Sequence, residues 1–197
     1  MNTEIAKNTA TWEDYLSVFE HLLNSDNPPA PYTNPAYLNY VKLNHSRQKR
    51  WLKTGVLTQD IIAEVKKING VQTWNIITEL WCGDAAHSIP FLKLISEHNP
   101  LITVKIVWRD TPPFLIEDYL TNGGKSVPKL VVRDADENDL FTWGPRPEPC
   151  QQIYLEMKEK NAPFEEQKVA LQNCYNTDKG ETIQKELLEL LRKSNRS

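Results

Sequence analysis

Cys82 is the residue whose type and position are best suited to chemistry. It follows residues 76–81, an apolar stretch with β-branched and aromatic side chains that is typical of a buried strand. Asp84 suits the first turn of a following helix, which apolar residues at three- and four-residue spacing extend to Asn99. Because unpaired N–H groups at the amino end of a helix stabilise an anion, we expect this thiol to ionise more readily than free cysteine, whose pKa is ~8.5.

Two motifs, in the expected order, make the chain resemble the thioredoxin superfamily. Residues 81–85, Trp-Cys-Gly-Asp-Ala, match the Trp-Cys-x-x-Cys of that superfamily except that Ala85 replaces the second cysteine. Residues 124–132, Gly-Lys-Ser-Val-Pro-Lys-Leu-Val-Val, resemble its loop in which a cis proline, here Pro128, packs beside the cysteine. The resemblance covers residues 71–160 of the chain.

This resemblance implies both a fold and a site. The expected fold is α/β and thioredoxin-like, with a central mixed β-sheet flanked by helices and with N-terminal and C-terminal helical extensions. The similarity is greatest to a divergent thioredoxin-like group that has Trp-Cys-Gly-Asp and a later Trp-Gly-Pro-Arg-Pro, here residues 143–147. The residues expected to bind substrate around the cysteine are Trp81, Gly83, Asp84, Val127, Pro128 and Trp143.

Charged neighbours should set the reactivity of Cys82. Asp84 carries a like charge that disfavours a thiolate, whereas Arg146 would favour one if its loop folds over the cysteine as in thioredoxins. Glu79 is either a general acid or base near the sulfur or a polar contact at the strand edge. His87 is expected to be a polar residue on the helix face rather than a base.

A single thiol in the motif limits the reaction. In thiol–disulfide exchange a thiolate attacks sulfur, and a second thiol normally resolves the mixed disulfide that forms. Ala85 cannot supply that thiol, so an external small thiol, Cys150 or Cys174 resolves the adduct, or Cys82 is not an exchange catalyst. Cys150 is the better internal candidate because it follows the loop at residues 143–147, although free cysteines commonly pack as small buried apolar residues.

Composition excludes several functional classes. The 197 residues are 40% hydrophobic and 25% charged, which is typical of a globular protein with one substantial core. The net charge of −3 gives no overall attraction to nucleic acid or membranes, and we interpret the basic run at residues 45–51 as a helix carboxyl end. Without a signal peptide, phosphate loop or zinc-type cysteine pairing, we expect a soluble cytoplasmic protein with reduced cysteines and with no cofactor or metal.

Periodicity and turn residues divide the chain into three segments. Residues 1–70 are predicted to be a helical extension packed on the core, residues 71–160 the thioredoxin-like domain, and residues 161–197 a second helical extension, with residues 1–10 as a frayed terminus. Besides the central strand and the helix after Cys82, helices are predicted near residues 11–24, 35–43, 58–69, 114–120, 147–160, 163–171 and 182–191, and strands near residues 101–108, 130–133 and 140–143.

Two functions from different classes fit these residues. The leading hypothesis is a monothiol redox protein, an oxidoreductase-like thiol at Cys82 that exchanges disulfides with a client protein or small-molecule thiol or forms and clears thiol adducts. The alternative is a non-catalytic thioredoxin-fold module that holds an extended peptide by backbone hydrogen bonds. A monothiol peroxidase is a weaker third hypothesis, because it would want a Thr or Ser close before the reactive cysteine.

Overall fold

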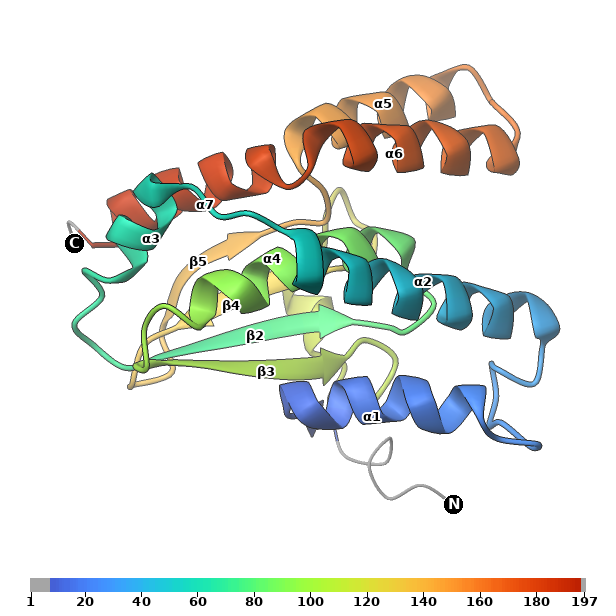
Figure 1. Ribbon diagram of the computed structural model, residues 1–197, viewed down its shortest axis with the longest axis horizontal. Coiled ribbons are helices and arrows are strands. Elements are labelled where there is room, and N and C mark those ends of the chain that lie inside the picture. Colours follow the sequence, from blue (N-terminus) through green and yellow to red (C-terminus); the bar gives the residue numbers. More distant parts are fainter. Residues whose placement is uncertain (1–7, 196–197) are drawn as a thin grey trace.

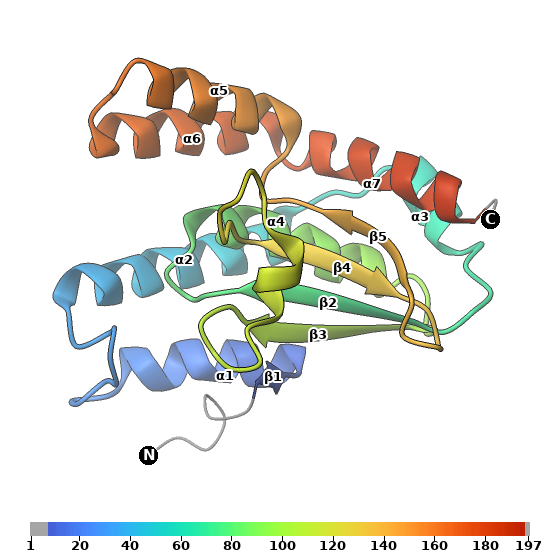
Figure 2. The same ribbon diagram turned by 180° about the vertical axis from the view of Figure 1, so that it is seen from behind.

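A mixed sheet of five strands carries the fold, and helices lie against it (Figures 1 and 2). The structure is a computed structural model and describes residues 8–195. The strands are β1 (Thr9–Ala10), β2 (Gln72–Thr78), β3 (Ile102–Trp108), β4 (Lys129–Arg133) and β5 (Asp139–Trp143), in the spatial order β1-β3-β2-β4-β5. Strands β2 and β3 are parallel and the other pairs are antiparallel. The predicted α/β fold with a central mixed sheet is confirmed.

Strand β2 positions the cysteine. It lies between β3 and β4, so both of its edges are hydrogen-bonded, and Trp74, Ile76 and Ile77 are fully buried. Because the strand is covered on both faces, its polar residues Gln72, Asn75 and Thr78 are buried as well. The chain turns after Thr78 and enters helix α4 (Gly83–Ser96), which contains Pro90 and begins immediately after Cys82.

Over residues 8–70, the N-terminal segment consists of one short strand and three helices. Helices α1 (Trp12–Leu23), α2 (Pro35–Thr54) and α3 (Gln59–Val65) begin at Thr11, Asn34 and Thr58, whose side chains accept backbone N–H groups as helix caps. Helix α1 lies along the β3 side of the sheet and α2 packs on α4 (Figure 1). The apolar side chains that this segment buries completely are Tyr15, Val18, Phe19, Leu22, Val41, Ile61 and Val65.

The prediction of a frayed terminus over residues 1–10 is wrong at Thr9 and Ala10. These two residues form β1 and pair with Val107 and Ile106 of β3. A two-residue strand has too little periodicity to be recognised in a sequence, and its place is fixed by the partner strand rather than by its own residues. The rest of that prediction, residues 1–7, lies outside the described residues.

Three helices complete the chain after the short 3₁₀ helix η1 (Leu115–Tyr119) and the β4–β5 hairpin. Helices α5 (Glu148–Glu159) and α6 (Phe164–Asp178) lie side by side as a hairpin, and α7 (Glu181–Ser194) packs on α3 and β5 (Figures 1 and 2). One hydrophobic cluster includes residues from the sheet, the N-terminal helices and α7. Within residues 8–195, no helix is both long and apolar enough to cross a membrane.

Candidate functional site

Cys82 lies where the two sequence motifs meet. Its sulfur accepts the backbone N–H of Ala85 at 3.4 Å and so caps helix α4. Its thiol also donates to the carbonyl oxygen of Val127 at 3.3 Å, and the Val127–Pro128 peptide bond is cis. The strand–helix junction and the proline loop therefore form one site, although 45 residues separate them in the chain.

Burial makes the Cys82 thiol difficult to ionise. The side chain is 5% exposed, and the loss of water around it, together with the nearby Asp84 carboxylate, raises the pKa of the thiol to about 12. The N–H of Ala85 and the Arg146 guanidinium act in the opposite direction but with smaller effect. The expectation of a readily ionised thiol is therefore wrong for this conformation, because desolvation exceeds the stabilisation available at the helix end.

Asp84 is held by two residues from beyond the proline loop. The Arg146 guanidinium lies 2.7 Å from one carboxylate oxygen, and the Tyr175 hydroxyl donates to the other at 2.8 Å. Asp84 and Arg146 expose only 12% and 14% of their side chains. The loop carrying Arg146 does reach the Cys82 region, but the cation is paired with Asp84 and stacks on the Tyr154 ring at 4.2 Å. Tyr175 had no sequence signal that would associate it with this site.

Gly144 allows the loop after β5 to approach the proline loop. Its φ angle is +111°, and a Cβ atom there would lie 2.3 Å from the carbonyl oxygen of Pro128. A side chain at this position would clash with backbone and adopt a disfavoured conformation. The glycine of the Trp-Gly-Pro-Arg-Pro stretch thus places Arg146 within reach of Asp84.

Glu79 lies at the edge of the site. Its carboxylate accepts the backbone N–H of Asp110 at 3.0 Å. A polar contact at the strand edge was one of the two roles expected for Glu79, the other being a general acid or base. Burial, reinforced by the Asp110 charge, raises the pKa of the Glu79 carboxyl to about 7, while Arg109 and the backbone N–H groups oppose this shift. Its carboxyl group is therefore partly protonated at neutral pH.

The residues expected to bind substrate are divided between surface and interior. Trp81 is half-buried, with the Arg109 guanidinium 4.6 Å above its ring and the exposed Tyr37 edge-on to it at 6.3 Å. Gly83 is partly exposed beneath Arg47, whereas Val127 and Pro128 are buried. Trp143 is 6% exposed and donates its indole N–H to Glu186 of α7 at 2.6 Å. Trp143 therefore does not share an open surface with Trp81.

Comparisons with known proteins agree with the fold. Residues 31–162 match the family described as Thioredoxin. The chain belongs to the thioredoxin family. The matched region begins before α2, so it includes two of the helices that the sequence pattern assigned to an extension. No curated protein matches the chain significantly.

Two solved structures are similar to this thioredoxin-family protein. One is a protein of unknown function from Pseudomonas aeruginosa, with 14% identity, a TM-score of 0.56, and coverage of 94% of this chain and 99% of that chain. The other is an HIV epitope-scaffold, with 13% identity, a TM-score of 0.56, and coverage of 93% and 98%. At these identities the similarity shows the fold, and it extends over nearly the whole length of both proteins.

Cys150 is not a free thiol in this thioredoxin-family protein. It forms a disulfide with Cys174, and Cys82 is the free cysteine. The expectation that all three cysteines are reduced is wrong for this pair, and Cys150 cannot resolve an adduct on Cys82 while the disulfide is present. Nothing in the spacing of the cysteines indicates this bond, because the pairing depends on how α5 and α6 pack.

His87 connects helix α4 to the helices that cover it. Its Nδ1 accepts the indole N–H of Trp51 at 2.9 Å, and its ring stacks on Tyr175 with 4.5 Å between centroids. The sequence predicted a polar residue on the helix face, but the side chain is 4% exposed. Burial, with the nearby Arg47 and Arg50 charges, lowers the pKa of His87 to about 3.

We expect His87 to make the fold sensitive to acid. Because its pKa of about 3 in the folded protein lies below the 6.5 of the free side chain, protonation favours unfolding, and stability is lost as pH falls below 6.5. The loss should reach about 3 kcal/mol at pH ~4. Urea unfolding of the wild type and His87→Gln at several pH values checks this, since the variant should show a shallower decline. Equal slopes would contradict the assignment.

Proposed function

We propose that this protein is a monothiol redox protein of the thioredoxin family, and that Cys82 is its reacting group. The observation that carries the proposal is the contact between Cys82, at the amino end of α4, and the carbonyl oxygen of Val127 in the proline loop. If a substrate disulfide took the place of the Val127 carbonyl beside Cys82, the Cys82 sulfur would face it. Backbone groups of the proline loop could then orient the substrate. Trp-Cys-Gly-Asp with Ala85 in the second cysteine position makes the chain a monothiol member of the family.

The reaction has two exchange steps. The Cys82 thiolate attacks one sulfur of a client or small-molecule disulfide, so a mixed disulfide forms, the substrate S–S bond breaks, and the leaving sulfur takes a proton. The thiolate of an external thiol then attacks the substrate sulfur of the mixed disulfide, so a disulfide forms between the external thiol and the substrate, and Cys82 leaves as a thiolate. Ala85 cannot perform this second step, and Cys150 is already bonded to Cys174.

Two neighbours are suited to assist the first step. Glu79 is the candidate proton acceptor, because its carboxyl has a pKa of about 7 and its backbone carbonyl already accepts the N–H of Cys82 at 3.1 Å. Arg146 is the candidate stabiliser of the thiolate, because its guanidinium lowers the pKa of the Cys82 thiol even while it is paired with Asp84. Both act only after the sulfur has become accessible to substrate.

A peptide-binding module is the second candidate function. The observation in its favour is that the Cys82 thiol is buried and hydrogen-bonded to protein, while the exposed Tyr37 lies against the half-buried Trp81 ring. Such a surface could hold an extended segment of a client protein without any sulfur chemistry. Reactivity of Cys82 separates the two functions.

The first experiment tests the exchange reaction in a protein whose only thiol is Cys82. In the Cys150→Ala/Cys174→Ala variant, oxidised glutathione should form one adduct at Cys82, detectable as a mass increase, and added reduced glutathione should remove it. Further replacement of Ala85 by Cys should instead give a disulfide between positions 82 and 85, since related motifs place these positions within bonding reach. Cys82→Ser in the same background is the control and should form no adduct. If neither the Cys82 nor the Ala85→Cys protein reacts, the peptide-binding function is the correct one.

A further inference from the structure

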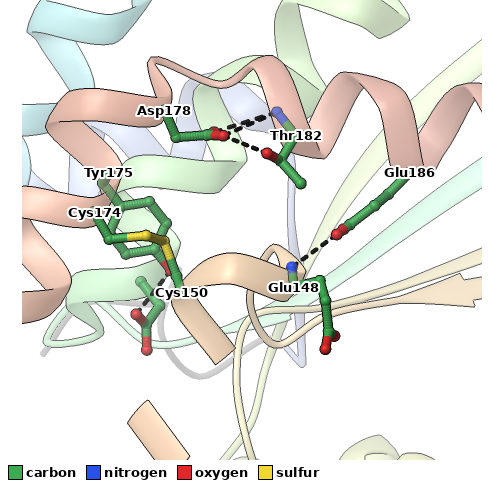
Figure 3. Close-up of a disulfide and its surroundings, with 8 residues drawn as sticks. Glu148, Cys150, Cys174, Tyr175, Asp178, Thr182 and Glu186 are labelled. Atoms are coloured by element: carbon green, nitrogen blue, oxygen red, sulfur yellow. Dashed lines mark hydrogen bonds between the residues drawn. A yellow bond between two sulfur atoms is a disulfide. The ribbon is translucent and has the colours of Figure 1, made fainter. Parts of the chain in front are cut away.

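The Cys150–Cys174 disulfide lies beside the candidate site rather than within it. It joins the first turn of α5 to α6 (Figure 3). The residue after Cys174, Tyr175, contacts Asp84 and His87 of α4, and Gln172 of α6 also lies 3.3 Å from the His87 ring. We propose that this disulfide is a second redox site of the protein, and that its reduction unties α6 from the first turn of α5, lets α6 move away from α4 and opens access to Cys82. Regulation of redox activity by this disulfide rests on the proposed function, whereas the movement of α6 on reduction does not.

Tyr175 is the contact through which α6 covers the site. Its hydroxyl donates to Asp84, its ring stacks on His87, and it is 5% exposed. Asp84 is two residues from Cys82, and the Tyr175 hydroxyl is close enough to Cys82 for the two groups to interact electrostatically. A displacement of α6 would therefore remove the cover from the amino end of α4.

The hairpin has almost no apolar core of its own. Cys150 is the buried residue of α5 and Tyr175 is that of α6, whereas Leu155, Phe164 and Val169 remain exposed. Since burial of apolar surface is the main force that holds helices together, the disulfide supplies an unusually large part of the connection between α5 and α6. Small units with few buried apolar contacts open more easily than the rest of a protein.

Polar groups make the other contacts between α6 and α2. Arg47 donates to Gln172, Arg50 donates to Asn176 at 2.9 Å, and Lys168 donates to Tyr40 at 3.0 Å. Water can replace such hydrogen bonds at little net cost, so they cannot hold the hairpin closed as strongly as a covalent bond. The disulfide joins α6 to the first turn of α5, four residues after Arg146, and so adds a covalent restraint on the position of Tyr175 that these hydrogen bonds do not supply.

The disulfide is accessible to a reductant from one side. Cys150 is completely buried and Cys174 is only partly buried, so the proposal places the attack of an external dithiol at the sulfur of Cys174. This attack forms a mixed disulfide and releases Cys150 as a thiolate, which takes a proton. The second thiol of the reductant then displaces Cys174, and two electrons have passed from the dithiol to the protein.

The test is the rate at which iodoacetamide modifies Cys82 at a fixed pH. Cys82 is the one free thiol of the oxidised wild type, and it is the only thiol of Cys150→Ala/Cys174→Ala, so intact mass reports on the same group in both. We expect modification about tenfold faster in the variant, and a ratio below about threefold would overturn the proposal. Circular dichroism establishes that both proteins are folded. If the variant does not fold, wild type reduced with dithiothreitol replaces it, with modification at Cys82 followed by peptide mass mapping under the same criterion.

Two substitutions in α6 test the contact between Tyr175 and Asp84 separately from the disulfide. Tyr175→Phe removes the hydroxyl bonded to Asp84 but retains the ring, and modification of Cys82 should be faster than in wild type even with the disulfide intact. Asn173→Ala changes an exposed residue two positions away and should leave the rate unchanged. Equal rates in the two variants would contradict a cover that acts through Tyr175.

Different results would contradict the control of access by the disulfide and the redox role of Cys82. If the disulfide does not control access, Cys82 reacts at one rate in both forms and any exchange activity is also the same in both. If Cys82 is not a redox group, its modification by iodoacetamide still accelerates when the disulfide is absent, but no reversible adduct with oxidised glutathione appears.

Discussion

Removal of residues 1–70 is expected to leave a chain that cannot fold cooperatively. The helices in that segment bury Tyr15, Phe19, Leu22 and Ile61 completely, in the same hydrophobic cluster as strands β2 and β3. Each such side chain contributes about 1.5–3 kcal/mol through burial, whereas a whole domain has a net stability of only ~5–15 kcal/mol. Urea titration of the 71–197 fragment, followed by tryptophan fluorescence, should show no sigmoidal transition. A soluble fragment with a cooperative transition would contradict this prediction.

Two neighbouring substitutions in α1 test the same argument within the full chain. Phe19→Ala should lower the free energy of unfolding by about 3–5 kcal/mol, because it leaves a cavity where the fully buried ring packs on Tyr15 and on His45 of α2. Glu20→Ala removes an exposed side chain whose ion pair with Lys49 is long, at 3.7 Å, and should change stability by less than about 0.5 kcal/mol. Comparable losses in the two variants would show that the segment acts by some means other than burial.

Asp84→Ala is expected to produce the largest loss of stability among single charge substitutions near the site. The change leaves the Arg146 guanidinium, which is 14% exposed, without its carboxylate and removes the acceptor of the Tyr175 hydroxyl. Breaking a buried ion pair from one side costs about 3–5 kcal/mol, because the remaining charge is uncompensated. Urea unfolding at neutral pH measures this loss.

Asp110→Ala is the matched control for Asp84→Ala. Its ion pair with Arg109 has the same 2.7 Å separation, but Asp110 exposes 53% of its side chain. Exposed pairs contribute only about 0–1 kcal/mol because water already solvates both charges. If the two variants lose the same stability, burial of the Asp84–Arg146 pair is not what makes it important.

The features that could be predicted from sequence are those encoded by neighbouring residues. The apolar run before Cys82, the helix after it and the β4–β5 hairpin all have local periodicity and turn residues, and each is present in the structure. The meeting of Cys82 with Pro128 could also be anticipated, but only because two motifs together resembled a known family.

Contacts between distant segments could not be predicted. Tyr175 is 91 residues from Asp84, and nothing near it in the sequence indicates that its hydroxyl reaches that carboxylate. The reactivity of Cys82 was misjudged for the same reason, since the helix end that favours a thiolate is a local feature whereas the burial that opposes it comes from distant parts of the chain. The Cys150–Cys174 bond likewise depends on the packing of two helices.

The short strand β1 also limits how other chains can associate with the sheet. It occupies the outer edge of β3 at Val107 and Ile106, and the remaining part of that edge carries the exposed Lys105. At the opposite side of the sheet, α7 packs on β5. An edge that is paired, charged or covered gives no template for adding a foreign strand, so copies of this protein should not assemble edge to edge into fibrils at high concentration.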